Sequence, residues 1–168
     1  DLLPFVRDNR FVPSGREYIV ARGLQEGFAG DYLVAVHLLI PQLETSLRHV
    51  LGQYGVVTSG LDDDGVQDEF DLNRLLSSST FSTPLTRVFG EDFVFDLRGL
   101  LVERFGANLR NDMAHGLMDL GAFYSAPGRY LWWFCLHFYL WPKMTPVTRD
   151  DENVAGKQET TEGPSEVW

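Results

Sequence analysis

The sequence predicts an all-α protein, a bundle of about five to six helices. Two long segments, residues 31–50 and 92–105, repeat apolar side chains at steps of three and four, which is the spacing of one buried helix face. An aspartate begins each segment and a glycine follows the second, as expected at helix ends. Hydrophobic residues make up 44% of the chain and charged residues 23%, the composition of a globular protein with a core.

The first 30 residues are predicted to hold a lead-in and one short helix. Residues 1–11 place four apolar side chains around Pro4 and are expected to be extended. A proline and a serine at residues 13–14 offer a helix start, so residues 14–28 are predicted as a helix that Gly23 and Gly27 weaken.

Residues 31–50 are predicted to form the strongest helix. Asp31 is a good N-cap, because its carboxylate can accept a hydrogen bond from a free amide of the first turn. Pro41 removes a backbone donor and crowds the carbonyl of His37, so a kink but no break is expected there. The apolar stripe consists of Leu33, Val36, Ile40, Leu43, Leu47 and Val50.

Residues 52–67 are predicted to be loop, since they are rich in glycine and contain three consecutive aspartates at 62–64. This acidic cluster lacks the alternating ligands and closing glutamate of a calcium loop, so a solvated loop tip is expected. Residues 70–76 are predicted as a short helix, and residues 77–83 as a polar linker before Pro84.

Two helices are predicted over residues 92–120. Asp92 is expected to cap the first, which would carry Phe105 on its buried face and end at Gly106. Asn108 is expected to cap the second, residues 109–120, which Gly121 and residues 125–128 would end.

A dense aromatic run at residues 130–141 is predicted to form the last helix, which would end before Pro142. Its 12 residues are too few to span a membrane, which takes about 20. The run could stack bases, but such density is more typical of a core or an interface. Cys135 and His137 are two residues apart and provide too few ligands for a metal site.

These segments divide the chain into three parts: residues 1–30, residues 31–141 as one helical domain, and residues 142–168 as a polar, irregular tail. The chain begins at Asp1, without an initiator methionine or a signal peptide. We therefore expect a fragment of a longer protein, with room for an additional domain. Its one cysteine, Cys135, excludes an intrachain disulfide and favours a reducing, cytoplasmic compartment.

The segment that concentrates candidate catalytic side chains is residues 108–116, with the sequence Asn-Leu-Arg-Asn-Asp-Met-Ala-His-Gly. On a helix, Asn111 and His115 are four apart and share a face. Arg110 lies about 140° round the axis from His115, so only its long side chain or a second copy across a dimer axis would bring the two together. A helix start favours a phosphate, arginine offers phosphate oxygens a planar fork, and histidine transfers protons near neutral pH.

The pattern Arg110-Asn111-x-x-x-His115-Gly116 resembles the hallmark of the DUF4209 family, and R-x4-H is the catalytic signature of the wider HEPN superfamily of ribonuclease-like domains. The resemblance extends from about residue 31 to about residue 120. It includes a helix with Glu44 and Arg48 four apart, and the Phe-Asp-Leu-Arg stretch that ends at residue 98.

This resemblance implies a HEPN-like homodimer in which two motifs share a cleft, and metal-independent cleavage of single-stranded or looped RNA without a cofactor. His115 would act as general base on the ribose 2′-hydroxyl or as general acid on the leaving oxygen. Arg110 would stabilise charge at phosphorus, and Asn111 would orient the phosphate or His115. The products would be a 2′,3′-cyclic phosphate and a 5′-hydroxyl. The supporting residues would be Glu44, Arg48, Asn108, Asp112 and Gly116.

The roles of Glu44 and Arg48 stay open between a surface pair and a half-buried pair that supports the motif. The net charge of −10 argues against a broad basic surface for duplex nucleic acid, but leaves room for a pocket that accepts one phosphate. RNA could still be attracted if arginines gathered in one cleft. The candidate arginines are Arg48, Arg98, Arg104 and Arg110.

The alternative hypothesis is a non-catalytic HEPN-like dimerisation or nucleotide-sensing module of a larger protein. The acidic charge, the fragment-like start and the aromatic helix motivate it. In that case Asn111 and His115 would make structural hydrogen bonds in a dimer interface.

Overall fold

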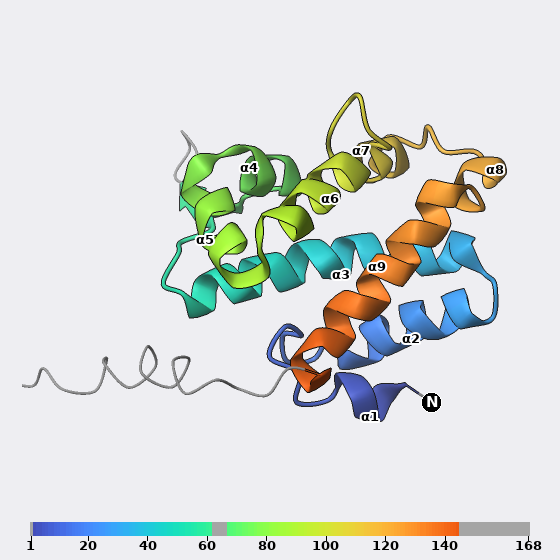
Figure 1. Ribbon diagram of the computed structural model, residues 1–168, viewed down its shortest axis with the longest axis horizontal. Coiled ribbons are helices and arrows are strands. Elements are labelled where there is room, and N and C mark those ends of the chain that lie inside the picture. Colours follow the sequence, from blue (N-terminus) through green and yellow to red (C-terminus); the bar gives the residue numbers. More distant parts are fainter. Residues whose placement is uncertain (1, 62–66, 145–168) are drawn as a thin grey trace, which may run out of the picture.

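Residues 2–61 and 67–144 are the part of the chain that the computed structural model describes (Figure 1). Within it there are nine helices and one small two-stranded sheet, so the predicted all-α class is confirmed. Two long helices organise the molecule, α3 (Tyr32–Gln53) and α9 (Ala126–Met144). In Figure 1, α9 crosses α3, with α2 on one side of α3 and the α4–α7 group on the other.

Helix α3 supplies the centre of the core. The carboxylate of Asp31 accepts a hydrogen bond from the amide of Val34 at 3.0 Å, which confirms the predicted N-cap. The helix runs through Pro41 without a break, and the Thr45 hydroxyl donates to the Pro41 carbonyl at 2.9 Å. The predicted stripe is buried at Val36, Ile40, Leu43, Leu47 and Val50.

The N-terminal segment adds to the same core. Residues 1–11 were predicted to be extended, which is wrong where they are described: α1 (Leu3–Val6) makes one helical turn, and Pro4 sits in that first turn, where no amide donor is needed. Helix α2 (Glu17–Phe28) packs against α3 and α9. Its glycines allow this contact, because a Cβ on Gly23 would lie 2.8 Å from Leu39 and one on Gly27 only 2.1 Å from Trp132.

The predicted loop at residues 52–67 contains more structure than expected. Helix α3 continues to Gln53, and β1 (Ser59–Leu61) pairs antiparallel with β2 (Gln67–Glu69), with Ser59 opposite Glu69. The predicted acidic tip, residues 62–64, lies outside the described residues.

Two helices follow the hairpin. Helix α4 (Leu72–Ser77) is capped by the Asp71 carboxylate, which accepts from the Arg74 amide at 2.9 Å. Residues 77–83 were predicted to be a linker, which is wrong, because α5 (Ser79–Phe89) covers most of them and includes Pro84. Phe81 and Leu85, four residues apart, are both buried and hold this helix on the core.

Helix α6 (Glu91–Leu101) ends earlier than predicted. Its N-cap is Gly90, so Asp92 lies in the first turn and not at the cap. Phe105 is fully exposed beyond the end of the helix, which contradicts its expected place on the buried face. Gly106 is not a helix-ending residue either: a Cβ there would lie 2.0 Å from the Gly99 carbonyl oxygen, and this close approach requires glycine.

The single helix predicted at residues 109–120 is wrong. Instead, α7 (Leu109–Ala114) and α8 (Leu120–Phe123) are separate short helices. Gly116 has a φ of 67°, in the left-handed region, and turns the chain away directly after His115. The Asp119 carboxylate then caps α8 by accepting from the Ala122 amide at 2.8 Å.

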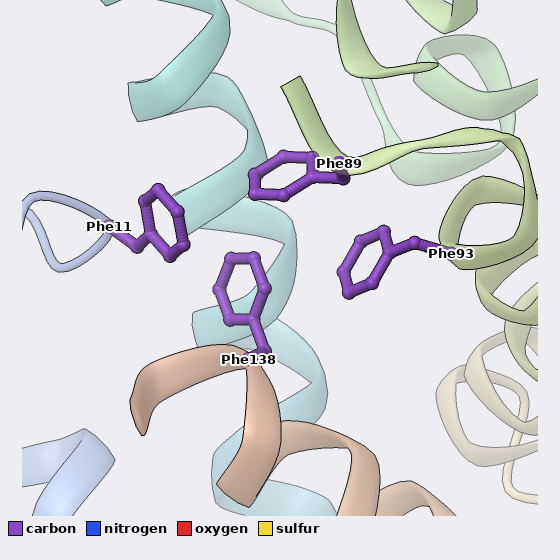
Figure 2. A pocket seen from close by; sticks show the side chains of 4 residues that line it. All are labelled: Phe11, Phe89, Phe93 and Phe138. Atoms are coloured by element: carbon purple, nitrogen blue, oxygen red, sulfur yellow. The ribbon is translucent and has the colours of Figure 1, made fainter. Parts of the chain in front are cut away.

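Of the two expected places for the aromatic helix, a core or an interface, the structure shows the core for one of its faces. The predicted bounds are wrong, because α9 begins at Ala126 and runs through Pro142. Four phenylalanine rings from the N-terminal segment, α5, α6 and α9 meet around a void of about 10 Å³ (Figure 2). The rings of Phe11 and Phe138 stack with centroids 5.0 Å apart, and those of Phe89 and Phe93 lie 4.8 Å apart. Cys135, also on α9, is buried, and burial raises the pKa of its thiol. None of the helices in the described ranges has both the length and the apolar character needed to cross a membrane.

We predict that Gly27→Ala lowers the free energy of unfolding by about 1–3 kcal/mol, because the new methyl group would collide with the Trp132 ring. Gly52→Ala is the matched control, since Gly52 also lies in a helix and has no atom within 4 Å of an added Cβ. The control should be neutral, or stabilising by up to about 1 kcal/mol. Urea denaturation measures both, and equal stabilities for the two variants would contradict the packing described for α2.

Candidate functional site

The motif side chains leave α7 in two directions. Asn111 and His115 face an open hollow of about 410 Å³, which we call the polar hollow, whereas Arg110 points towards α3. This division follows the helical geometry expected from the sequence, in which Arg110 lies on a different face from His115. The polar hollow is lined by Asn73, Val102, Arg104, Asn108, Asn111, Asp112, His115 and Leu117.

The backbone of His115 makes a hydrogen bond to the protein, whereas its imidazole ring makes none in the described part of the chain. It is the C-terminal cap residue of α7, and its amide donates to the Asn111 carbonyl at 3.0 Å. The side chain is exposed, and no hydrogen bond to its ring is found within residues 2–61 and 67–144. Both ring nitrogens are therefore open to a ligand in the hollow.

The side-chain amide of Asn111 uses all of its hydrogen-bonding positions on protein partners. Its Oδ1 accepts from Asn73 Nδ2 at 3.0 Å and from Arg110 Nη1 at 3.1 Å. Its Nδ2 donates to Asn73 Oδ1 at 3.2 Å and to Asn108 Oδ1 at 2.7 Å. A primary amide has two donor hydrogens and two acceptor positions, so all four are used. Of the two roles expected for Asn111, the geometry favours positioning of the helix that carries His115 over direct binding of a phosphate.

Arg110 is bound into an ion-pair network and does not line the polar hollow. Its Nε lies 3.5 Å from Glu44 Oε2, and its Nη2 lies 3.9 Å from Asp71 Oδ2. Its side chain is 20% exposed. No hydrogen bond joins Arg110 to His115 in the described part of the chain, so within one protomer Arg110 reaches the site through Asn111.

Glu44 lies between two guanidinium groups. Its Oε1 accepts from Arg48 Nη1 at 2.8 Å, while its other oxygen faces Arg110. Arg48 Nη1 also donates to the Phe70 carbonyl at 3.0 Å. The sequence left open whether Glu44 and Arg48 form a surface pair or a half-buried pair. The structure has the half-buried pair, because the Glu44 side chain is only 16% exposed. The pair links α3 to the segment before α4 and to α7.

The remaining supporting residues shape the turn at the start and end of α7. Asn108 has a φ of 49°, and its side chain does not cap the helix as expected, but donates to Asp112 Oδ1 at 2.8 Å. Gly116 ends the helix and leaves the imidazole of His115 at its edge. Helix α7 has only six residues, so the dipole at its N-terminus is small.

Sequence reasoning missed two contributors to the site. Asn73 forms the reciprocal amide pair with Asn111 across 38 residues, and Asp71 contacts Arg110. No local pattern marks such a long-range polar contact. Four arginines were candidates to gather in one cleft. Of these, Arg104 alone lines the polar hollow, and Arg98 pairs with Glu103 at 2.9 Å.

Within the described ranges, no three His, Cys, Asp or Glu side chains lie close enough together to hold a metal ion. Comparisons with known proteins gave no match to a protein-family model, to a curated protein or to a solved structure.

We predict that Glu44→Gln lowers the free energy of unfolding by about 1–3 kcal/mol, because it leaves two half-buried guanidinium groups without their shared carboxylate. Glu26→Gln is the matched control, since Glu26 pairs with an Arg22 side chain that is 53% exposed and should matter by less than about 1 kcal/mol. Chemical denaturation compares the two. If both changes had the same small effect, Glu44 would not be the structural link described above.

Proposed function

We propose that this chain is a HEPN-type, metal-independent endoribonuclease, with His115 as its proton-transfer group. One observation carries the proposal: the His115 imidazole stands exposed and without a hydrogen-bond partner among the described residues, at an open hollow lined by amide side chains. Such a group can give and take protons near neutral pH. The Glu44–Arg110–Asn111 contacts behind it fix the helix that carries it.

In the proposed reaction, His115 removes the proton from a ribose 2′-hydroxyl, and the 2′-oxygen attacks the adjacent phosphorus. The bond from phosphorus to the 5′-oxygen breaks, and the leaving oxygen takes up the proton that His115 removed, so the imidazole returns to its starting state. The products are a 2′,3′-cyclic phosphate and a 5′-hydroxyl, with no water consumed. Positioned proton transfer of this kind contributes on the order of a hundredfold or more to the rate.

Arg110 acts in this proposal as a positioning residue of its own protomer, because Glu44 and Asp71 hold its guanidinium away from the polar hollow. Direct charge stabilisation at phosphorus by Arg110 would apply to a homodimer that brings a second motif to the same hollow. The substrate is RNA in single-stranded or looped form, since a chain with a net charge of −10 is poorly suited to a broad duplex surface.

We predict that the parent protein cleaves a labelled single-stranded RNA in the presence of a chelator, and that His115→Ala slows cleavage by about a hundredfold or more. Arg110→Ala should also lose cleavage, because Asn111 and α7 lose their anchor. His49→Ala is the control, since His49 bonds to Gln53 and does not line the polar hollow.

Product analysis should find the 2′,3′-cyclic phosphate on the upstream fragment. The proposal fails if His115→Ala cleaves as fast as the parent, or if cleavage stops when divalent metal is removed.

A second candidate function is a non-catalytic dimerisation or nucleotide-sensing module. The observation that favours it is the complete engagement of Arg110 and Asn111 in internal contacts. Under this hypothesis the motif variants weaken self-association or ligand binding, and no version cleaves RNA. Sedimentation of the parent and of His115→Ala separates the two: unchanged association in both, with cleavage by the parent alone, excludes the module.

A further inference from the structure

A second hollow lies directly beside the polar hollow. We call it the apolar hollow, and its volume is about 540 Å³. It lies where the second half of α6 faces the first turns of α9, and nearly all of its exposed lining is carbon. The residues that matter here are Phe95, Asp96, Leu100, Ala107, Pro127 and Tyr130.

The two hollows share one wall, the loop of residues 102–108 between α6 and α7. Ala107 lines the apolar hollow, and Asn108, the next residue, lines the polar one. Consecutive Cα atoms are about 3.8 Å apart, so the linings of the two hollows adjoin at this point of the loop. The Ala107 amide donates to the Gly99 carbonyl at 2.9 Å, and the Gly106 amide donates to the Glu103 carbonyl at 3.0 Å, which fixes the loop as a ridge.

The polar side of the ridge carries an available positive charge. Arg104 lines the polar hollow and is exposed, and no ion pair involving it is found in the described part of the chain. Its neighbours differ, since Arg98 and Glu103 pair with each other at 2.9 Å. Asp112 lines the same hollow, but its Oδ1 accepts from Asn108 at 2.8 Å. In a protein with a net charge of −10, a guanidinium without an ion pair among the described residues, in the hollow that also holds His115, favours a bound anion.

The apolar side carries exposed aromatic rings. Phe95 is 77% exposed and Tyr130 is 40% exposed. The Tyr130 hydroxyl donates to Asp96 Oδ2 at 2.9 Å, and its ring stacks on Trp133 with centroids 5.5 Å apart, so the ring is held in place. Burial, and then the hydrogen bond and charge of Asp96, raise the pKa of Tyr130. A fixed flat ring at the surface is a stacking platform.

We infer that a nucleotide next to the cleaved bond crosses this ridge, with its phosphate at Arg104 in the polar hollow and its unpaired base against Phe95 and Tyr130 in the apolar hollow. The inference rests on the proposed function, because it names a second binding position for the same substrate. A nucleotide combines an anion with a flat apolar ring within one repeat unit, which matches the paired chemistry of the two sides. A base inside a duplex is paired and stacked, and cannot reach the apolar hollow.

The experiment measures binding of short fluorescent single strands made of 2′-deoxynucleotides, which lack the attacking hydroxyl and are not cleaved. One probe carries bases, and a second is abasic but has the same number of phosphates. We expect Tyr130→Ala and Phe95→Ala to weaken binding of the base-bearing probe by about tenfold or more, with binding of the abasic probe unchanged. Arg104→Ala should weaken both probes. Tyr130→Phe keeps the ring and is the matched control.

Equal binding of the base-bearing probe by the parent, Tyr130→Ala and Phe95→Ala would overturn the inference, as would no binding by the parent. A change from dimer to monomer in Phe95→Ala, with unchanged probe binding, would overturn it too and assign the apolar hollow to a second copy of the chain. RNA cleavage separates this failure from that of the proposed function. If cleavage depends on His115 but not on the aromatic rings, the inference alone fails. If base-dependent binding is found without any cleavage, the proposed function fails and the binding position stands.

Discussion

The carboxylate of Glu44 is the point at which the central helix meets the motif. Two guanidinium groups, from Arg48 and Arg110, converge on it in a half-buried setting, where like charges without a counter-charge would repel strongly. Arg110 in turn binds Asn111, whose amide holds Asn73 and Asn108. The direction of α7, and with it the place of His115, follows from this chain of contacts. Much of the motif therefore serves to build the site.

Arg110 and His115 have different tasks because they lie on different faces of one short helix. The face towards α3 is sheltered, and its polar atoms are paired with protein. The face towards the polar hollow is open, and its imidazole and the nearby Arg104 are available to a ligand. An acidic protein can in this way present one guanidinium, without an ion pair among the described residues, and one imidazole in a hollow that Asp112 also lines, without a broad basic surface.

The sequence was informative wherever one helix had a strong cap and a long apolar stripe. Asp31 and the stripe of α3 predicted the central helix because both signals are local. Residues 77–83 were predicted to be a linker because most of them are serine or threonine. Most of them are helical because the buried side chains of Phe81 and, just beyond, Leu85 pack α5 against the core. The helix at 109–120 was predicted too long, since the left-handed turn at Gly116 stops it. At residues 77–83 tertiary packing overrides local preference, whereas the stop at Gly116 is a local signal of the kind that glycine gives after a helix.

In the candidate site too, local spacing was predictable from the sequence and long-range contacts were not. Spacing along a helix correctly placed Asn111 and His115 on one face, and Glu44 and Arg48 as a pair. It could not supply Asn73 or Asp71, which come from a segment far away in the chain. It also could not say which of the four arginines would line the polar hollow: Arg104 does, and it lies in the loop where Gly106 closely approaches Gly99.

The central claim is that a phosphate of RNA binds beside His115, and NMR of the histidine rings tests it most directly. The chain has 4 histidines, so their ring signals can be followed one by one while a nucleoside 2′,3′-cyclic phosphate, the expected product end, is added. The proposed site predicts that the His115 signals shift progressively and saturably, while those of His37, His49 and His137 stay in place. Unmoved His115 signals at high ligand concentration, or a shift centred on another histidine, would contradict it.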